Sequence, residues 1–344
     1  MITVLIIAGF VLLFIGGEAL VRGSVGVARK LGLSEFIIGV TLIGFGTSLP
    51  ELVTSLQALS QGSVGLSVGN VIGSNVANIM LVIGAAALIA PIFTQPRALA
   101  RDGLFMVAVT ILFIALVYFD LFTRTTGIAL VALLLIYLIG SILLDRRETS
   151  AAASVHAAEA EEFDHDDPLW LAFLLTLAGI AGVIFGARFL VDGGAQAARL
   201  FGVSETVIGI SIVAIGTSLP ELVTAIAAAR KGKADVALGN VLGSNVFNIL
   251  GILGVSALVY PFSILNGGVV FDLEVPLAAE ALQYAETLVT MTDIGAIMLS
   301  VVLLGLFAFT RKRIARWEGA ILLTGYILYM GLRFELIPTF GFGV

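Results

Sequence analysis

The chain has 344 residues, of which 59% are hydrophobic and only 12% are charged, and its mean hydropathy is +1.10. A water-soluble domain carries about 25% charged residues, so this composition excludes a soluble protein and predicts one embedded in the lipid bilayer, with no nucleic-acid partner. Cysteine is absent, which also excludes disulfides and thiolate metal sites.

Ten apolar segments are long enough to cross the ~30 Å hydrocarbon core as helices, because lipid offers a backbone amide no partner outside its own helix. In chain order they cover residues 2–22, 35–60, 65–90, 103–119, 125–144, 169–191, 205–229, 235–260, 294–310 and 317–334. Their continuous apolar runs exclude a β-barrel, and the first lacks the basic start and the cleavage pattern of a signal peptide. The predicted fold class is an all-α integral membrane protein with ten transmembrane helices.

Lys and Arg are concentrated in the loops that follow the odd-numbered helices. These loops hold Arg22, Arg29, Lys30, Arg97, Arg101, Arg146, Arg147, Arg230, Lys231, Lys233, Arg311, Lys312, Arg313 and Arg316. The opposite side holds only Arg124, Arg188, Arg199 and Arg333. By the positive-inside rule the first set faces the cytoplasm. We therefore expect a multi-pass protein of the cell (inner) membrane with both termini outside.

The sequence repeats itself after 170 residues. This shift aligns GTSLPELVTS (46–55) with GTSLPELVTA (216–225), and GNVIGSNVANI (69–79) with GNVLGSNVFNI (239–249). Each half contains five predicted helices, an odd number, so the second half must enter the membrane from the opposite side. We predict two inverted five-helix repeats, residues 1–144 and 169–344.

Two segments interrupt this regularity. Residues 145–168 form an acidic cytoplasmic linker, which either senses cations or, as its composition favours, is a solvated tether. From Asp293 onward the shift becomes 191, which matches Asp293 to Asp102 and leaves extra residues around 262–290. The sequence does not assign a role to either segment.

Polar residues near the predicted helix ends have simpler interpretations. Glu18 and Arg22 are four residues apart, as are Arg188 and Asp192 in the second repeat. A gate is conceivable, but we expect ordinary i, i+4 ion pairs. Ser34 and Ser204 are predicted to cap the N-termini of the second and seventh helices.

Each copy of the first motif places a glutamate directly after a proline inside an apolar segment. Pro50 has no amide hydrogen, so the carbonyl of Gly46 loses its helical partner inside the membrane. On a helix Thr47 and Ser48 lie with Glu51 beside that carbonyl. The second copy repeats the arrangement with Gly216, Thr217, Ser218, Pro220 and Glu221.

The second motif adds amides and further hydroxyls. Ser74 and Asn78 share a helix face at i, i+4, as do Ser244 and Asn248. Carboxylates, hydroxyls, amides and carbonyls without His or Cys suit hard cations such as Ca²⁺ and Na⁺, and suit Mg²⁺ less well. The alternative is a packing kink with an inert, protonated acid, but two symmetric copies favour a functional site.

GTSLPEL followed by GN-x-x-GSN-x-x-N, twice in inverted halves, resembles the prokaryotic Na⁺/Ca²⁺ exchanger branch of the calcium/cation antiporter superfamily. The resemblance covers nearly the whole chain, and it implies alternating access and cation sites on the second, third, seventh and eighth helices. The ligands that it implies are Glu51, Glu221, Thr47, Ser48, Thr217, Ser218, Ser74, Ser244, Asn78 and Asn248, with the carbonyls of Gly44 and Ala214.

The expected function is antiport of Ca²⁺ against several Na⁺, with these ions as substrates, no cofactor and no enzymatic activity. A single chain is sufficient for such transport, and the oligomeric state is left open. Related proton/calcium exchangers carry acid–histidine motifs, whereas His156 and His165 both lie in the linker. Some potassium-dependent relatives have an aspartate where this chain has Asn248, so we expect no need for K⁺. The alternatives are H⁺/Ca²⁺ exchange on the same scaffold and a passive cation channel.

Overall fold

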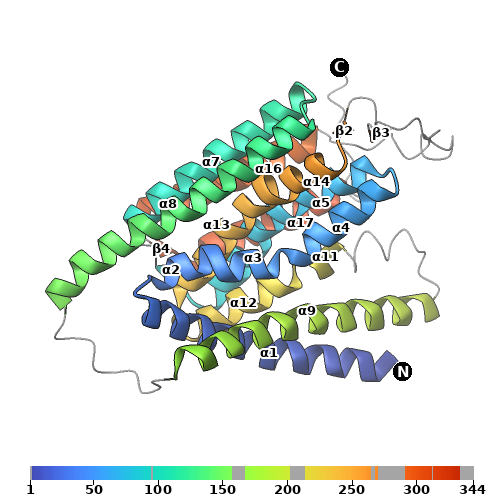
Figure 1. Ribbon diagram of the computed structural model, residues 1–344. Coiled ribbons are helices and arrows are strands. Elements are labelled where there is room, and N and C mark those ends of the chain that lie inside the picture. The colour runs from blue at the N-terminus through green and yellow to red at the C-terminus, as the bar shows by residue number, and fades with distance from the viewer. Residues whose placement is uncertain are drawn as a thin grey trace. The chain divides into compact units, whose positions relative to one another are not determined.

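The computed structural model describes residues 2–93, 96–156, 167–201, 214–264, 268–269, 291–311 and 313–333 (Figure 1). In these ranges the chain is almost entirely helical, and its four strands have two residues each. Six helices are long and apolar enough to cross a membrane. They are Ile2–Leu31, Val64–Ile89, Ala100–Tyr118, Arg124–Arg146, Leu169–Ala197 and Ala234–Val259.

These six helices coincide with six of the predicted segments and confirm a multi-pass, all-α protein. The broken pair Glu35–Thr47 and Leu49–Ser60 corresponds to the second segment, and the shorter apolar helix Thr292–Ala308 to the ninth. The last segment corresponds to α17 (Arg316–Arg333). The seventh is described only from Ala214 onward, and the count of ten helices stays a prediction.

The chain divides into two compact units, and each draws on both predicted repeats. The first unit is Met1–Ser48 with Leu135–Ser244, and the second is Leu49–Leu134 with Asn245–Val344. Residues 157–166 of the acidic linker, Ser204 and the extra residues 270–290 lie outside the described residues.

The first unit contains seven whole helical elements and parts of two others in its described residues. They are α1 (Ile2–Leu31), α2 (Glu35–Ile38), the π-helix η1 (Gly39–Ile43), α3 (Gly44–Thr47), α9 (Leu169–Leu200), α11 (Ala214–Thr217), α12 (Leu219–Arg230), α13 (Ala234–Val246) up to Ser244, and the later part of α8 (Arg124–His156).

The second unit contains the remaining described elements. They are α4 (Leu49–Ser60), α5 (Val64–Val76), η2 (Ala77–Ile83), α6 (Gly84–Ile89), β1 (Ile92–Phe93), α7 (Pro96–Tyr118), the start of α8, η4 (Phe247–Ile252), α14 (Leu253–Val259), β2 (Phe262–Ser263), β3 (Gly268–Val269), α16 (Met291–Arg311), β4 (Arg313–Ile314) and α17. The π-helical segments had not been predicted, because nothing in their local sequence distinguishes them from α-helix.

Two contacts in the second unit lie at equivalent positions of the sequence repeat. Strands β1 and β4 pair antiparallel, with Ile92 opposite Ile314 and Phe93 opposite Arg313. The backbone N–H of Phe262 donates to the carbonyl of Phe122 (3.1 Å), and the two rings stack at 4.6 Å. Position 262 follows 92 by 170 residues and 313 follows 122 by 191, the two shifts of the sequence repeat. Each contact thus joins one half of the chain to the other.

Helices α1 and α9 pack side by side through their glycines (Figure 1). A Cβ atom built on Gly23 would lie 2.5 Å from the backbone nitrogen of Thr176 and 2.7 Å from the carbonyl oxygen of Ala172. Small residues let two membrane helices approach to this extent. Backbone atoms, unlike the end of a flexible side chain, cannot move aside to make room.

We expect Gly23→Ala to destabilise the protein, because overpacking of this kind costs about 1–3 kcal/mol. The measurement is the apparent melting temperature in detergent. Gly140→Ala in α8 is the matched control, since a Cβ there meets nothing within 4 Å and alanine favours helix over glycine by about 1 kcal/mol. Equal melting temperatures for the two variants would contradict the close approach of α1 and α9.

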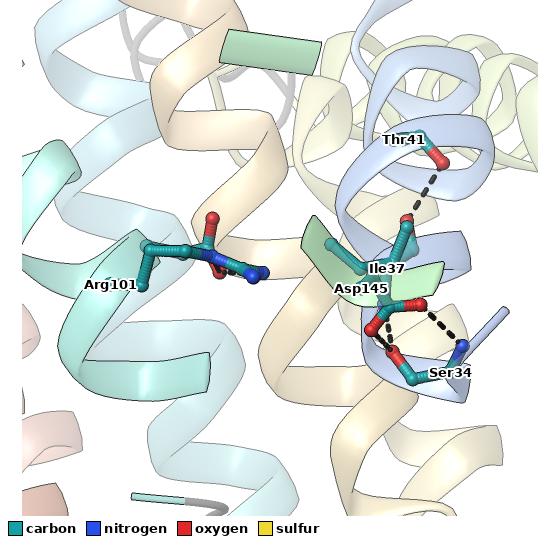
Figure 2. Close-up of polar contacts among 6 residues, drawn as sticks. Ser34, Ile37, Thr41, Arg101 and Asp145 are labelled. Atoms are coloured by element: carbon teal, nitrogen blue, oxygen red, sulfur yellow. Dashed lines mark hydrogen bonds and ion pairs between the residues drawn. The ribbon is translucent and has the colours of Figure 1, made fainter. Parts of the chain in front are cut away.

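The predicted cap of the second helix is confirmed and has an additional partner. The Ser34 hydroxyl accepts a hydrogen bond from the Ile37 N–H (3.2 Å). It also donates to Asp145 Oδ1 (2.6 Å), and the Ser34 N–H donates to Asp145 Oδ2 (2.8 Å). Figure 2 shows the Asp145 carboxylate facing both groups. The buried acid Asp145, in the later part of α8, is thereby satisfied by the start of α2.

The ion pair predicted between Glu18 and Arg22 is replaced by pairs with other segments. Arg22 binds Asp167 through two nitrogens, the shorter contact being 2.9 Å. Glu18 pairs with Lys231 at 2.6 Å. A bidentate guanidinium–carboxylate pair is stronger than an end-on i, i+4 contact. Arg188 and Asp192 do approach as predicted, although only to 4.0 Å.

Candidate cation-binding site

In both copies of the proline motif, the helix is broken at the serine that precedes the Leu-Pro pair. Ser48 separates α3 from α4 and has φ −89° and ψ 6°, and Ser218 separates α11 from α12 with φ −89° and ψ 3°. Proline supplies no N–H to the carbonyl four residues before it, so the helix loses a hydrogen bond across this step. The predicted opening of the helix at each motif is confirmed, and its geometry is the same in both copies.

In the first unit the Glu221 carboxylate is surrounded by hydroxyl groups. Glu221 is only 1% exposed, and its Oε1 accepts a hydrogen bond from Ser48 Oγ at 3.2 Å. The side chains of Thr47 and Ser244 also lie beside this carboxylate. Ser244 Oγ lies 3.2 Å from the Gly44 carbonyl oxygen, to which it donates. Four other predicted ligands, from Thr47, Ser48, Ser244 and Gly44, are thus brought together with this carboxylate.

A glycine permits this meeting of α13 with the helix of the first proline motif. A Cβ atom on Gly243 would overlap the carbonyl oxygen of Val40. Only a residue without a side chain lets the two backbones lie so close. Gly243 therefore holds Ser244 within reach of Gly44.

The other predicted ligands of the first unit lie on the chain just before Glu221. Ser218 is buried at the helix break, and its carbonyl accepts the Leu222 N–H at 3.1 Å. Thr217 ends α11 and Ala214 begins it. The described contacts do not join Ala214 to the Glu221 carboxylate.

In the second unit a hydrogen bond to its backbone carbonyl positions Glu51. Its side chain is 1% exposed, and its carbonyl oxygen accepts from Asn70 Nδ2 at 3.1 Å. The same Asn70 nitrogen donates to Ser55 Oγ at 2.9 Å. Asn70 on α5 thereby fixes the first turn of α4, the turn that carries Glu51.

Ser74, Asn78 and Asn248 are all buried in the second unit. Asn78 Nδ2 donates to Asn245 Oδ1 at 3.1 Å. The described contacts do not join Ser74 to the other predicted ligands.

Several buried polar atoms have no hydrogen-bond partner among the described residues. They include Glu221 Oε2, Asn78 Oδ1 and both amide atoms of Asn248. Such atoms are rare in folded proteins because leaving them unpaired costs free energy. All three residues belong to the predicted ligand set. A hard cation bound at Glu221 Oε2 in the first unit, or at the amide oxygens of Asn78 and Asn248 in the second, would satisfy these atoms, so the residues present in each unit fit Ca²⁺ or Na⁺.

No group of three or more His, Cys, Asp or Glu side chains that could hold a metal occurs in the described part of the chain. A transition-metal centre built on such side chains is not found there, whereas oxygens from hydroxyls, amides and carbonyls are abundant.

Four asparagines that were not predicted as ligands also make side-chain hydrogen bonds in the two units. Asn70 and Asn240 correspond under the 170-residue shift, as do Asn75 and Asn245. Asn240 Oδ1 accepts from Thr47 Oγ1 at 3.3 Å, in the first unit. The signal was present, because all four belong to the repeated GN-x-x-GSN motif. The predicted ligands were only the serine and the last asparagine of each motif, paired at i, i+4 spacing, so these four asparagines were not included.

Comparison with known proteins decides the family. Residues 1–143 and 171–335 match the family model described as sodium/calcium exchanger protein. The chain belongs to the sodium/calcium exchanger family. The resemblance read from the two motifs is thereby confirmed.

Two relatives match this chain along almost its whole length. The sodium/calcium exchanger MaX1 of Methanosarcina acetivorans is 33% identical, covering 98% of this chain and 100% of MaX1. The putative antiporter CaxA of Alkalimonas amylolytica is 34% identical, covering 97% of this chain and 98% of CaxA.

A solved structure shares the fold. The sodium-calcium exchanger NCX_Mj, soaked with 2.5 mM Na⁺ and 0.1 mM Ca²⁺, matches with a TM-score of 0.74 and 32% identity. The match covers 96% of this chain and 97% of NCX_Mj. The all-α membrane fold predicted from the sequence is confirmed.

Proposed function

We propose that this chain exchanges Ca²⁺ for several Na⁺ across the inner membrane by alternating access, without K⁺ and without a cofactor. The observation that carries the proposal is the buried Glu221 carboxylate, which is surrounded by hydroxyls and keeps one oxygen without a partner among the described residues. A charged residue at the bilayer centre costs at least ~2.5 kcal/mol. The repeated motif gives Glu51 the same role.

The cation ligands in this proposal are the residues implied by the motifs. They are Glu51, Glu221, Thr47, Ser48, Thr217, Ser218, Ser74, Ser244, Asn78 and Asn248, with the carbonyls of Gly44 and Ala214. Ca²⁺ takes 6 to 8 oxygen ligands in flexible geometry, which this set can supply. Mg²⁺ demands a near-ideal octahedron and dehydrates reluctantly, so it fits less well.

Coupling follows from competition for the same two negative charges. One Ca²⁺ or a set of Na⁺ ions neutralises Glu51 and Glu221, and the protein changes sides only when they are neutralised. Because an uncompensated charge is costly in the membrane, the empty protein is held on one side. Ca²⁺ movement then requires Na⁺ movement in the opposite direction.

The test is Ca²⁺ flux into proteoliposomes that contain the purified protein, with gradients of Na⁺, H⁺ and K⁺ imposed one at a time. We expect an outward-directed Na⁺ gradient alone to drive Ca²⁺ uptake. Uptake driven by a proton gradient instead would favour H⁺/Ca²⁺ exchange, and uptake without any counter-gradient would favour a passive channel. Either result would overturn the proposal.

The proposal includes the inverted topology, with repeats 1–144 and 169–344, the linker 145–168 in the cytoplasm and both termini outside. Gln61 and Lys231 are exposed residues at equivalent positions of the two repeats. We expect single cysteines at these positions to react with an impermeant maleimide from opposite sides of the membrane, position 231 from the cytoplasm. The wild-type chain has no cysteine and is the unlabelled control. Labelling from the same side would contradict the inversion.

A further inference from the structure

Two asparagines of the repeated motif bond directly to each other in the second unit. Asn78 Nδ2 donates to Asn245 Oδ1 at 3.1 Å, and the two residues are 1% and 2% exposed. Because the Asn78 nitrogen bonds to Asn245, the oxygen of the Asn78 carboxamide points away from that contact. Asn78 Oδ1 has no partner among the described residues. The oxygen is the end of the amide that ligates a cation, whereas the NH₂ end repels one.

Contacts of its own nitrogen fix the orientation of the Asn245 carboxamide. Its Nδ2 donates to the backbone carbonyl of Asn75 at 3.4 Å and approaches the Sδ atom of Met106 at 3.7 Å. Both of these atoms are acceptors only. Turning the Asn245 amide over would place its oxygen against two acceptors and its NH₂ against that of Asn78, so the amide is held in one orientation.

We propose that Asn245 is a positioning residue that keeps the Asn78 carboxamide oxygen turned toward the transported cation. The contacts form a continuous chain, from Asn75 O and Met106 Sδ through Asn245 to Asn78. Residues that orient metal ligands in this way tune the affinity without touching the ion. The inference rests on the proposed function, because it takes Asn78 to be a cation ligand.

The arrangement is one-sided although the sequence motif is symmetric. Asn75, which corresponds to Asn245, donates its Nδ2 to the carbonyl of Val71 in its own helix at 2.8 Å. Asn248, which corresponds to Asn78, has neither amide atom bonded within the described residues. Positioning by a neighbouring asparagine is therefore a property of Asn78 and is not shared by Asn248.

The test measures the KM for Ca²⁺ in Na⁺-driven flux for Asn245→Leu, which keeps the volume and removes both polar atoms. Loss of an orienting residue lowers metal affinity about 10–100-fold, so we expect KM to rise by at least about 10-fold while flux at saturating Ca²⁺ stays near wild type. Thr110→Val is the control, since Thr110 is equally buried and its hydroxyl bonds only to the Met106 carbonyl of its own helix. Its KM should stay at the wild-type value.

A double-mutant cycle separates positioning from a general loss of structure. If Asn245 acts through Asn78, Asn245→Leu raises KM no further when Asn78→Ala is already present. Independent, multiplying effects would overturn the inference, as would an unchanged KM in the single variant. Should Asn245→Leu fail to fold, the same cycle is run with Asn245→Ala. Wild type without Na⁺-driven flux would overturn the proposed function as well, whereas the other outcomes leave it standing.

Discussion

Glu221→Gln and Glu51→Gln are each expected to reduce Na⁺-driven Ca²⁺ flux to the level of empty liposomes. Glutamine keeps the size of glutamate but removes one of the two charges that balance a divalent ion. In the Glu221 variant it also places an NH₂ group among the hydroxyls of Thr47, Ser48 and Ser244. The measurement is initial Ca²⁺ uptake at equal amounts of reconstituted protein.

Glu318→Gln is the matched control for these two variants. Glu318 is 2% exposed, and its Oε2 accepts the Ala315 N–H at 2.7 Å. Glutamine can accept the same hydrogen bond through its oxygen, so we expect wild-type flux and normal folding. Near-normal flux in either Glu51→Gln or Glu221→Gln would show that these carboxylates do not form the transport site.

Asn248→Asp is expected to make exchange depend on an additional monovalent cation, whereas wild type needs no K⁺. Asn248 is 1% exposed in η4, and its amide has no partner among the described residues. An added charge ~5 Å from a cation changes their interaction by about 3 kcal/mol at an effective dielectric near 20. The third negative charge must then be neutralised before the protein can change sides.

The measurement is Na⁺-driven Ca²⁺ flux with and without K⁺ for both proteins. Asn248→Ala is the control, because it removes the amide without adding charge and should weaken flux equally in the two conditions. Strict K⁺ dependence of wild type would contradict the assignment of two carboxylates as the charge of the site.

The sequence by itself was sufficient for features that depend on local chemistry. Its hydropathy predicted the membrane helices, because an apolar segment of sufficient length has no other stable place in lipid. The breaks at Ser48 and Ser218 followed from the prolines at 50 and 220, which remove a backbone donor whatever the surroundings. Two copies of an intramembrane glutamate motif were specific enough to indicate the family.

Tertiary structure decided which polar groups meet. Glu18 pairs with Lys231 instead of Arg22, and Asn78 bonds to Asn245. The partners are far apart in the chain, so their distance depends on helix packing and not on sequence spacing. Identical motifs also acquire different neighbours, since Asn245 bonds to Asn78 while Asn75 bonds to its own helix. A repeated sequence determines the same local backbone twice, but the packing around each copy decides what its side chains do.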